Sequence, residues 1–253
     1  RDLRRRGVRI ITGVRALRAM GTERLRSVQY RRHGTWRKIE SEVLFLHQGL
    51  VPDMNLAAAA GCAHDWSDNH LCWRPRLDPW GETTVAGIAM AGDSGSIGGS
   101  SPAMQGQLTA LGAAGRLGRL DNSERDRRAT TIREQLRSNQ SVQPFLDWLY
   151  RPARGFRVPK DDTVVVCRCE ELSLGDIRRA LEIGCPGPNQ LKSFVRCGMG
   201  PCQGRLCGLT VSEIIAAARG VPVAEVGHFR PRPPVKPLRL DELAGLEEQH
   251  HRS

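Results

Sequence analysis

Apolar residues in the first half of the chain fall into short runs separated by glycine and other turn-forming residues, which predicts strands rather than long helices. The predicted strands cover residues 8–11, 25–31 and 35–46. The last one ends in the unbroken apolar run VLFL at 43–46, which is typical of a strand buried on both faces. A short Ala-rich helix is predicted at 56–60, and residues 61–82 are expected to be irregular.

A second apolar run, TVAGIAMA at 84–91, leads into the glycine-rich stretch GDSGSIGGS and then into a helix-forming segment over 103–120. Strand, glycine-rich turn and helix in this order predict an α/β fold. Residues 123–150 read as one or two amphipathic helices, and residues 156–160 as a linker.

The pattern changes at Thr163, where a short strand (TVVV) precedes a mainly helical region. Ser173, followed three residues later by Asp176, predicts a helix with a capped N-terminus. A second helix is predicted from about Pro188 and a third over 209–219. The C-terminal third of the chain is therefore expected to be a small, separate helical domain.

Charge adds a prediction about partners. The 253 residues include 38 Lys+Arg against 27 Asp+Glu, a formal charge of +11. Nearly all of these cations are arginine, and they are spread along the chain without interleaved aromatic residues, so they do not indicate nucleic-acid binding. We expect a basic surface that meets an acidic partner protein of the same complex. The Pro-rich tail from Phe229 (PRPPVKP) is expected to be extended, outside the core, and to lie across that partner.

Composition narrows the class of protein. An apolar fraction of 40% is enough for a folded core. No apolar stretch approaches the about 18 residues of a membrane-spanning helix, and the first residues contain neither an initiator Met nor an apolar signal segment. The expectation is a cytoplasmic protein with at most peripheral membrane contact, and a C-terminal piece of a longer polypeptide.

Cysteine spacing carries the strongest chemical signal. Six of the eight cysteines fall between residues 167 and 207. A C-x-C pair (Cys167, Cys169) follows a predicted strand, and a C-x4-C pair (Cys202, Cys207) precedes a predicted helix. Clustered thiols in a protein without secretory features indicate a metal site, and four thiolates can hold an iron–sulfur cluster or a zinc ion.

The segment VCRCEELSLGDIRRALEIGCPGPNQLKSFVRCGMGPCQGRLCGLTVSEII resembles a bacterioferritin-associated-ferredoxin-like [2Fe–2S] domain. More narrowly, CRCE followed by RCGMGPCQGRLCG resembles the domain in the A (alpha) subunits of opine oxidases, hydroxyproline dehydrogenases and hydrogen cyanide synthase. The resemblance implies four cluster ligands: Cys167, Cys169, Cys202 and Cys207. Cys197 stays open as a replacement for Cys207, because both lie five residues from Cys202. Cys185 is expected to be a buried apolar group.

The glycine-rich turn suggests a second cofactor. Backbone N–H groups at such a turn suit a phosphate, and the segment is similar to the second flavin motif of the two-dinucleotide-binding-domain flavoproteins. The similarity implies FAD contacts from Gly92, Asp93, Gly95, Ile97, Gly98 and Gly99. The first FAD motif of those proteins (GxGxxG) does not occur in this sequence, so the FAD site is expected to be incomplete here. NAD(P) is a further candidate cofactor.

The resulting fold prediction is the C-terminal part of a two-dinucleotide-binding-domain α/β flavoprotein followed by a small, mainly helical [2Fe–2S] domain. Its parts are the end of an inserted nucleotide-binding domain (1–41), the C-terminal part of the FAD domain (42–122), a helical linker (123–160), the cluster domain (161–228) and the Pro-rich tail (229–253).

The function that the resemblance implies is that of an oxidoreductase subunit. It would carry electrons through FAD and the [2Fe–2S] cluster of a hetero-oligomeric amine or imino-acid dehydrogenase of the opine or hydroxyproline type. An FAD-containing partner subunit would oxidise the CH–NH donor, and the electron acceptor is not identified. The alternatives are a zinc-stabilised interaction module and another NAD(P)H-linked flavoprotein with the same small domain.

Elsewhere the sequence offers weaker signals. No nucleophilic catalytic pair is identifiable. A group of polar residues near the Trp-rich segment is interpreted as ordinary loop residues rather than metal ligands: His64, Asp65, Asp68, His70 and Cys72.

The ligand assignment generates a direct prediction. Cys169→Ser and Cys202→Ser should each abolish the cluster, because each removes one of four thiolates. Iron analysis of the purified variants checks this, and a full iron complement in either variant would contradict the assigned set.

Overall fold

The computed structural model describes residues 2–47, 49–95 and 102–245. The chain divides into two compact units, Arg1–Gln48 and Gly49–Ser253.

The first unit is built around a three-stranded antiparallel sheet in the order β1-β2-β3. Its elements are α1 (Asp2–Arg5), β1 (Val14–Met20), β2 (Ser27–Arg32) and β3 (Thr35–Glu40). The turn between β2 and β3 uses His33 and Gly34, whose φ angles of 48° and 82° suit a tight hairpin. Val28 and Tyr30 of the central strand are buried.

Two of the predicted strand positions in this unit are wrong. Residues 8–11 are irregular, and the strand lies at β1 instead, where it pairs with β2. The predicted third strand ends at Glu40, and residues 43–46 are not a strand. Phe45 there is 92% exposed. Strands need hydrogen-bonding neighbours, and the run 43–46 pairs with no segment that the structure describes.

The predicted strand at 84–91 is also absent. Gly87, with φ of 83°, turns the chain back, and the N–H of Ile88 donates to the carbonyl of Val85. What is left of the strand pairing is a single bridge between Glu82 and Ala89. A glycine in the left-handed region explains why the apolar run folds into a loop instead of continuing.

The second unit begins with α2 (Asn55–Ala59) and a hairpin that the sequence did not reveal, β4 (His64–Ser67) and β5 (Cys72–Pro75). Trp66 and Trp73 face each other across this hairpin, with ring centroids 5.7 Å apart. Such aromatic pairs stabilise two-stranded sheets. The segment predicted to be irregular is therefore ordered by its tryptophans.

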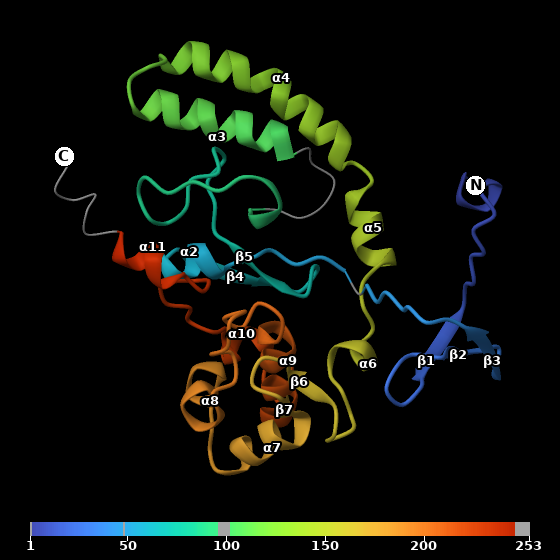
Figure 1. Cartoon of the computed structure of the whole chain (residues 1–253). Coiled ribbons are helices and arrows are strands. Elements are labelled where there is room, and N and C mark those ends of the chain that lie inside the picture. Colours follow the sequence, from blue (N-terminus) through green and yellow to red (C-terminus); the bar gives the residue numbers. More distant parts are fainter. Residues whose placement is uncertain (1, 48, 96–101, 246–253) are drawn as a thin grey trace. The chain divides into compact units, whose positions relative to one another are not determined.

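Helices follow. Those that the sequence predicts are α3 (Pro102–Arg116), α4 (Asn122–Gln140) and α5 (Gln143–Leu149), and two short ones that it does not predict are η1 (Gly92–Ser94) and α6 (Arg154–Arg157). The α3 and α4 helices lie side by side (Figure 1) and bury a small core of Leu108, Ala129 and Leu136. The carboxylate of Asp121 caps α4 by accepting a hydrogen bond from the N–H of Glu124 at 3.0 Å.

The elements from β6 to α10 enclose the main hydrophobic core. They are β6 (Val165–Cys167), β7 (Leu172–Ser173), α7 (Leu174–Glu182), α8 (Pro188–Val195), α9 (Gly208–Arg219) and α10 (Val223–Val226). The last helix, α11 (Leu240–Ala244), has no buried residue. The expected capping box is present, because Ser173 and Asp176 bond reciprocally at 2.8 and 3.2 Å. Leu174, Ile177, Leu191 and Ile215 are fully buried between the helices.

The start of the tail differs from the prediction. Phe229 is only 6% exposed and belongs to the main core, whereas the sequence predicts that it lies outside. Among the described residues, no helix is both long and apolar enough to cross a membrane.

A buried ion pair joins α6 to this core. Arg157 and Glu213 are 2.5 Å apart, and the side chain of Glu213 is 5% exposed. Arg157→Met leaves this carboxylate buried without a counter-ion, so we expect a loss of about 3 kcal/mol in the free energy of unfolding. Urea denaturation measures it. The double variant Arg157→Met/Glu213→Leu, which removes both charges, should recover most of that loss, and equal stability of the single variant and the parent would contradict the prediction.

Candidate metal centre

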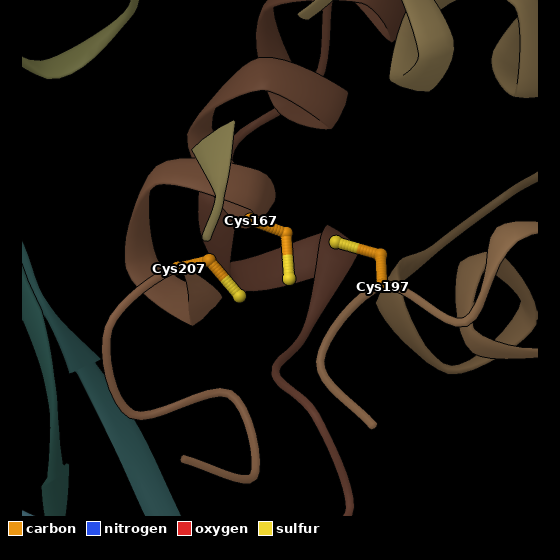
Figure 2. A group of neighbouring side chains, drawn as sticks. All are labelled: Cys167, Cys197 and Cys207. Carbon is orange, nitrogen blue, oxygen red and sulfur yellow. The ribbon is translucent and has the colours of Figure 1, made fainter. Parts of the chain in front are cut away.

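Three cysteine thiols meet inside the C-terminal core. The Sγ atoms of Cys167, Cys197 and Cys207 all lie within 4.8 Å of one another and point toward a common centre (Figure 2). They come from the end of β6, the loop after α8 and the residue before α9, and each is at most 2% exposed. All three are free thiols. The strand end at Cys167 and the loop segment that carries Cys197 and Cys207 thus bring three reduced thiols to one buried site.

The other two predicted ligands form a pair beside this group. Cys169 and Cys202 are half-buried and are not members of the group of three. Each of them shifts the pKa of the other, Cys167 acts on the pKa of Cys169, and Cys202 acts on that of Cys207, so the two residues lie near the group. Two of the four predicted ligands, Cys167 and Cys207, thus lie in the buried group together with Cys197.

Backbone N–H groups prepare Cys202 for a negative charge. Burial raises the pKa of Cys202, but hydrogen bonds from the N–H groups of Leu206, Gly204 and Arg205 and from Cys169 outweigh it, so the pKa is lowered overall. A thiolate held by converging N–H groups is the form that binds a metal. The loop 202–207 thus supplies both a ligand and the donors that stabilise its charge.

The pKa values of Cys169 and Cys207 are raised, so these two thiols favour the protonated form when no cation is near. The N–H of Cys202 lowers the pKa of Cys169, yet the thiol–thiol hydrogen bond with Cys202 and burial raise it overall. A hydrogen bond with Cys197, followed by burial, raises the pKa of Cys207. Several thiolates in a buried site need a cation to offset their mutual repulsion, so metal binding and deprotonation are coupled here.

Glycines allow the loop around the cysteines to close. Ideal Cβ atoms on Gly198 and Gly204 would lie 2.7 Å from atoms of the Phe229 ring, and one on Gly208 would lie 3.2 Å away. The ring of Phe229 fills the space that side chains at these positions would occupy. Gly198 and Gly204 also have φ of 82° and 80°.

A fourth glycine sets the distance to the C-x-C segment. A Cβ on Gly200 would lie 2.2 Å from Cβ and 3.3 Å from Sγ of Cys169. The loop can therefore approach Cys169 only without a side chain at position 200.

Further bonds hold the loop on its outer side. Asn55 donates its side-chain amide to the carbonyl of Gln203 at 3.0 Å, and Asp53 lies 4.0 Å from the guanidinium of Arg205. These contacts join the start of α2, and Asp53 just before it, to the cysteine loop.

The predicted FAD residues are described only in part. Gly92 and Asp93 lie in the short helix η1, where the N–H of Gly92 donates to the side chain of Gln105 at 2.8 Å, and Gly95 follows directly. Ile97, Gly98 and Gly99 lie outside the described residues. The helix α3 that follows is present, but the strand predicted before the turn is not, so the described residues do not form a complete FAD site.

The polar residues near the hairpin make local contacts. His64, Asp65 and Cys72 lie in the strands β4 and β5 and not in the irregular loop that the sequence predicts. His64 contacts the carbonyl of Cys62, Asp65 pairs with Arg76, Asp68 accepts from Trp66, and His70 lies 3.1 Å from Asp147. Burial raises the pKa of Cys72 to about 11. Within the described parts of the chain, they form no metal-binding group. Cys185 is buried and lies outside the thiol group, as expected.

The chain is similar to known proteins. The family model described as the sarcosine oxidase A3 domain matches residues 163–246. The opine oxidase A-subunit of Agrobacterium tumefaciens is 43% identical over 244 residues, which are 96% of this chain and 48% of that protein. The chain thus resembles opine oxidase A-subunits over nearly its whole length. The HcnB component of hydrogen cyanide synthase from Pseudomonas protegens is 30% identical over 214 residues, 84% of this chain and 45% of the relative.

The chain spans about half the length of these relatives. Among solved structures, the L-proline dehydrogenase of P. horikoshii matches with a TM-score of 0.67 at 20% identity, over 96% of this chain and 46% of that one. This likeness and the A3-domain match confirm the predicted fold class, part of a flavoprotein-type α/β chain followed by a small, mainly helical domain.

Two residues of the site could not be placed from the sequence. Cys197 is left open there as a replacement for Cys207, and the structure places it within the buried group. Its position directly before the glycine-rich loop indicates this, because that loop also carries Cys202. The role of Phe229 in the core could not be recognised, because a Pro-rich stretch follows it directly.

The close approach at Gly200 generates a prediction. Gly200→Ala should push Cys169 out of place and remove most of the bound metal while the helices remain folded. Metal per chain and far-ultraviolet circular dichroism check this. Gly106→Ala is the matched control, because a Cβ there meets nothing within 4 Å. It should keep the metal and stabilise α3 by roughly 0.5–1 kcal/mol. Normal metal content in Gly200→Ala would contradict the geometry.

Proposed function

We propose that this chain is the electron-transfer part of a hetero-oligomeric dehydrogenase or oxidase that acts on amines or imino acids of the opine or hydroxyproline type. The observation that carries the proposal is the convergence of three reduced, buried thiols, those of Cys167, Cys197 and Cys207, with the half-buried Cys169 and Cys202 near them and neither histidine nor carboxylate in the group. An all-sulfur donor set selects soft metal centres, above all iron–sulfur clusters and zinc. Similarity to the relatives favours an iron–sulfur cluster over zinc, because these proteins are named as oxidase and synthase subunits.

The proposed ligands are Cys167, Cys169, Cys202 and Cys207. When bound, a [2Fe–2S] cluster supplies one-electron transfer. The chain's own contribution is to hold the thiolates, exclude water and direct N–H groups at sulfur, and hydrogen bonds to sulfur tune the potential of such centres. The N–H groups around Cys202 fit this role.

Cys197 needs a role in this proposal, because its thiol lies in the same buried group. We assign it as a fifth thiol that packs against the ligands and bonds to Cys207. Cys197→Ala should then retain two irons per chain, whereas Cys207→Ala should lose them. The reverse result would exchange the two residues in the ligand set.

The rest of the proposal concerns the whole protein. FAD would bind near Gly92 and Asp93 once the complete domain is present, and an FAD-containing partner subunit would oxidise the CH–NH donor. Relatives named as subunits support a hetero-oligomer. The same thiol set also favours one alternative, a zinc-stabilised interaction module without redox activity.

The nature of the metal separates the two functions. Protein purified anaerobically should contain two irons and two acid-labile sulfides per chain and should give a rhombic electron paramagnetic resonance signal after reduction with dithionite. One zinc per chain and no visible absorption would overturn the electron-transfer proposal and support the interaction module.

A further inference from the structure

A wide groove runs along the outer side of the cysteine loop. Its walls are α8, the loop at 198–203 and the Pro-rich segment 230–237, and its volume is about 1080 Å³. Pockets for small ligands are typically about 300–1000 Å³ and mainly apolar. This groove exceeds that range, and its walls carry charge.

The charge is strongly one-sided. Five cations line the groove: Lys192, Arg196, Arg230, Arg232 and Lys236. The lining contains a single carboxylate, Glu170, which already pairs with Arg196 at 3.0 Å. Within the residues that the structure describes, the other four cations have no ion-pair partner, so most of the positive charge in the groove is uncompensated.

The tail segment that carries Arg230, Arg232 and Lys236 is attached to α8 through the backbone of Arg230. The N–H of Arg230 donates to the side chain of Asn189 at 2.8 Å, and Lys192 donates to the carbonyl of Arg230 at 2.7 Å. Phe229, buried against the glycines of the cysteine loop, anchors the same segment from below. The groove is therefore a formed feature of the fold and not a gap beside a loose tail.

Positively charged side chains face each other across the groove. Burial, and then the positive charge of Arg232, lower the pKa of Lys192. An arrangement that crowds cations without counter-ions is relieved when an anionic group binds between them. Arg196, Arg230, Arg232 and Lys236 are exposed, so a large partner can reach them.

The position of the groove matters as much as its charge. Gly198, Gly200 and Pro201 form part of its lining, and the same loop touches Cys169 through Gly200. Only the backbone of this loop therefore separates the groove from Cys169, a proposed cluster ligand. A redox partner seated here would approach the cluster as closely as the loop allows.

We propose that this groove is the docking surface for an acidic one-electron carrier protein, an inference that rests on the electron-transfer function proposed above. The groove residues would hold the carrier beside the loop of the proposed cluster ligands. A reduced [2Fe–2S] cluster held by these cysteines would supply one electron, so that the cluster would be oxidised and the carrier reduced, with no bond or proton changing place. Arginine clusters of this kind recognise acidic surfaces, and complementary charge accelerates the encounter.

Binding is tested first, because it does not require the cluster to be reduced. The probe is a plant-type [2Fe–2S] ferredoxin, a small acidic carrier, and its affinity for the full chain is measured by microscale thermophoresis at low and high salt. The groove variant Arg232→Glu/Lys236→Glu should weaken binding roughly tenfold at low salt. The control variant Arg119→Glu/Arg137→Glu makes the same change of charge on exposed residues outside the groove and should leave binding nearly unchanged.

Electron transfer is tested second, with two small one-electron oxidants of opposite charge. The dithionite-reduced chain is mixed with the Co(III)–EDTA anion or with the hexaamminecobalt(III) cation, and bleaching of the cluster is followed by stopped flow. The groove variant should slow oxidation by the anion and not by the cation, and added salt should reduce the difference between the groove variant and the parent chain. The control variant should behave as the parent chain does.

The outcomes separate the two proposals. Equal weakening by the groove and control variants would overturn the docking surface, as would binding of inorganic phosphate in the groove without binding of the ferredoxin. A protein without iron would overturn the electron-transfer function, and with it the carrier role, whatever the binding result. An intact cluster combined with carrier binding that does not depend on the groove would overturn the docking surface alone.

Discussion

The packing of one aromatic ring against three glycines stabilises the conformation of the cysteine loop in the C-terminal domain. Phe229 lies where the side chains of residues 198, 204 and 208 would be, and it thereby determines how the cysteine loop folds. The loop presents Cys202 to its N–H donors and Cys207 to the buried group. Directly after this ring, the N–H of Arg230 donates to Asn189 of α8, which holds the tail against this helix. The metal centre and the basic groove thus share one packing contact, although they lie on opposite sides of the loop.

The helical part of this fold could be predicted because its signals are local. Ser173 and Asp176 define the start of α7 by a hydrogen-bond pattern that needs only three residues of spacing. Pro188 marks the start of α8 in the same way, since proline is favoured in the first turn of a helix. The cysteines could be assigned to one site because thiols in a chain without secretory features have few other uses.

The strands could not be predicted as well, because strand formation depends on distant partners. The run at 43–46 has the composition of a buried strand, but composition cannot supply the neighbour whose backbone it must meet. The hairpin β4–β5 shows the opposite error, because its stability comes from a Trp–Trp contact that exists only once both strands are paired. At the metal centre, spacing alone could not place Cys197, since a residue's distance from a site is decided by how the loop folds and not by its count along the chain.

The ion pair between Arg157 and Glu213 and the ring of Phe229 together define how much of the chain the cysteine site requires. Arg157 lies before the C-x-C segment and pairs with Glu213 of α9, and Phe229 lies after α10 and belongs to the main hydrophobic core. A proteolytic fragment that begins after Arg157 or ends before Phe229 would retain every cysteine of the site and still lose one of these contacts. The independent unit that forms the cysteine site is therefore longer than the motif that reveals it, and extends from α6 into the beginning of the tail.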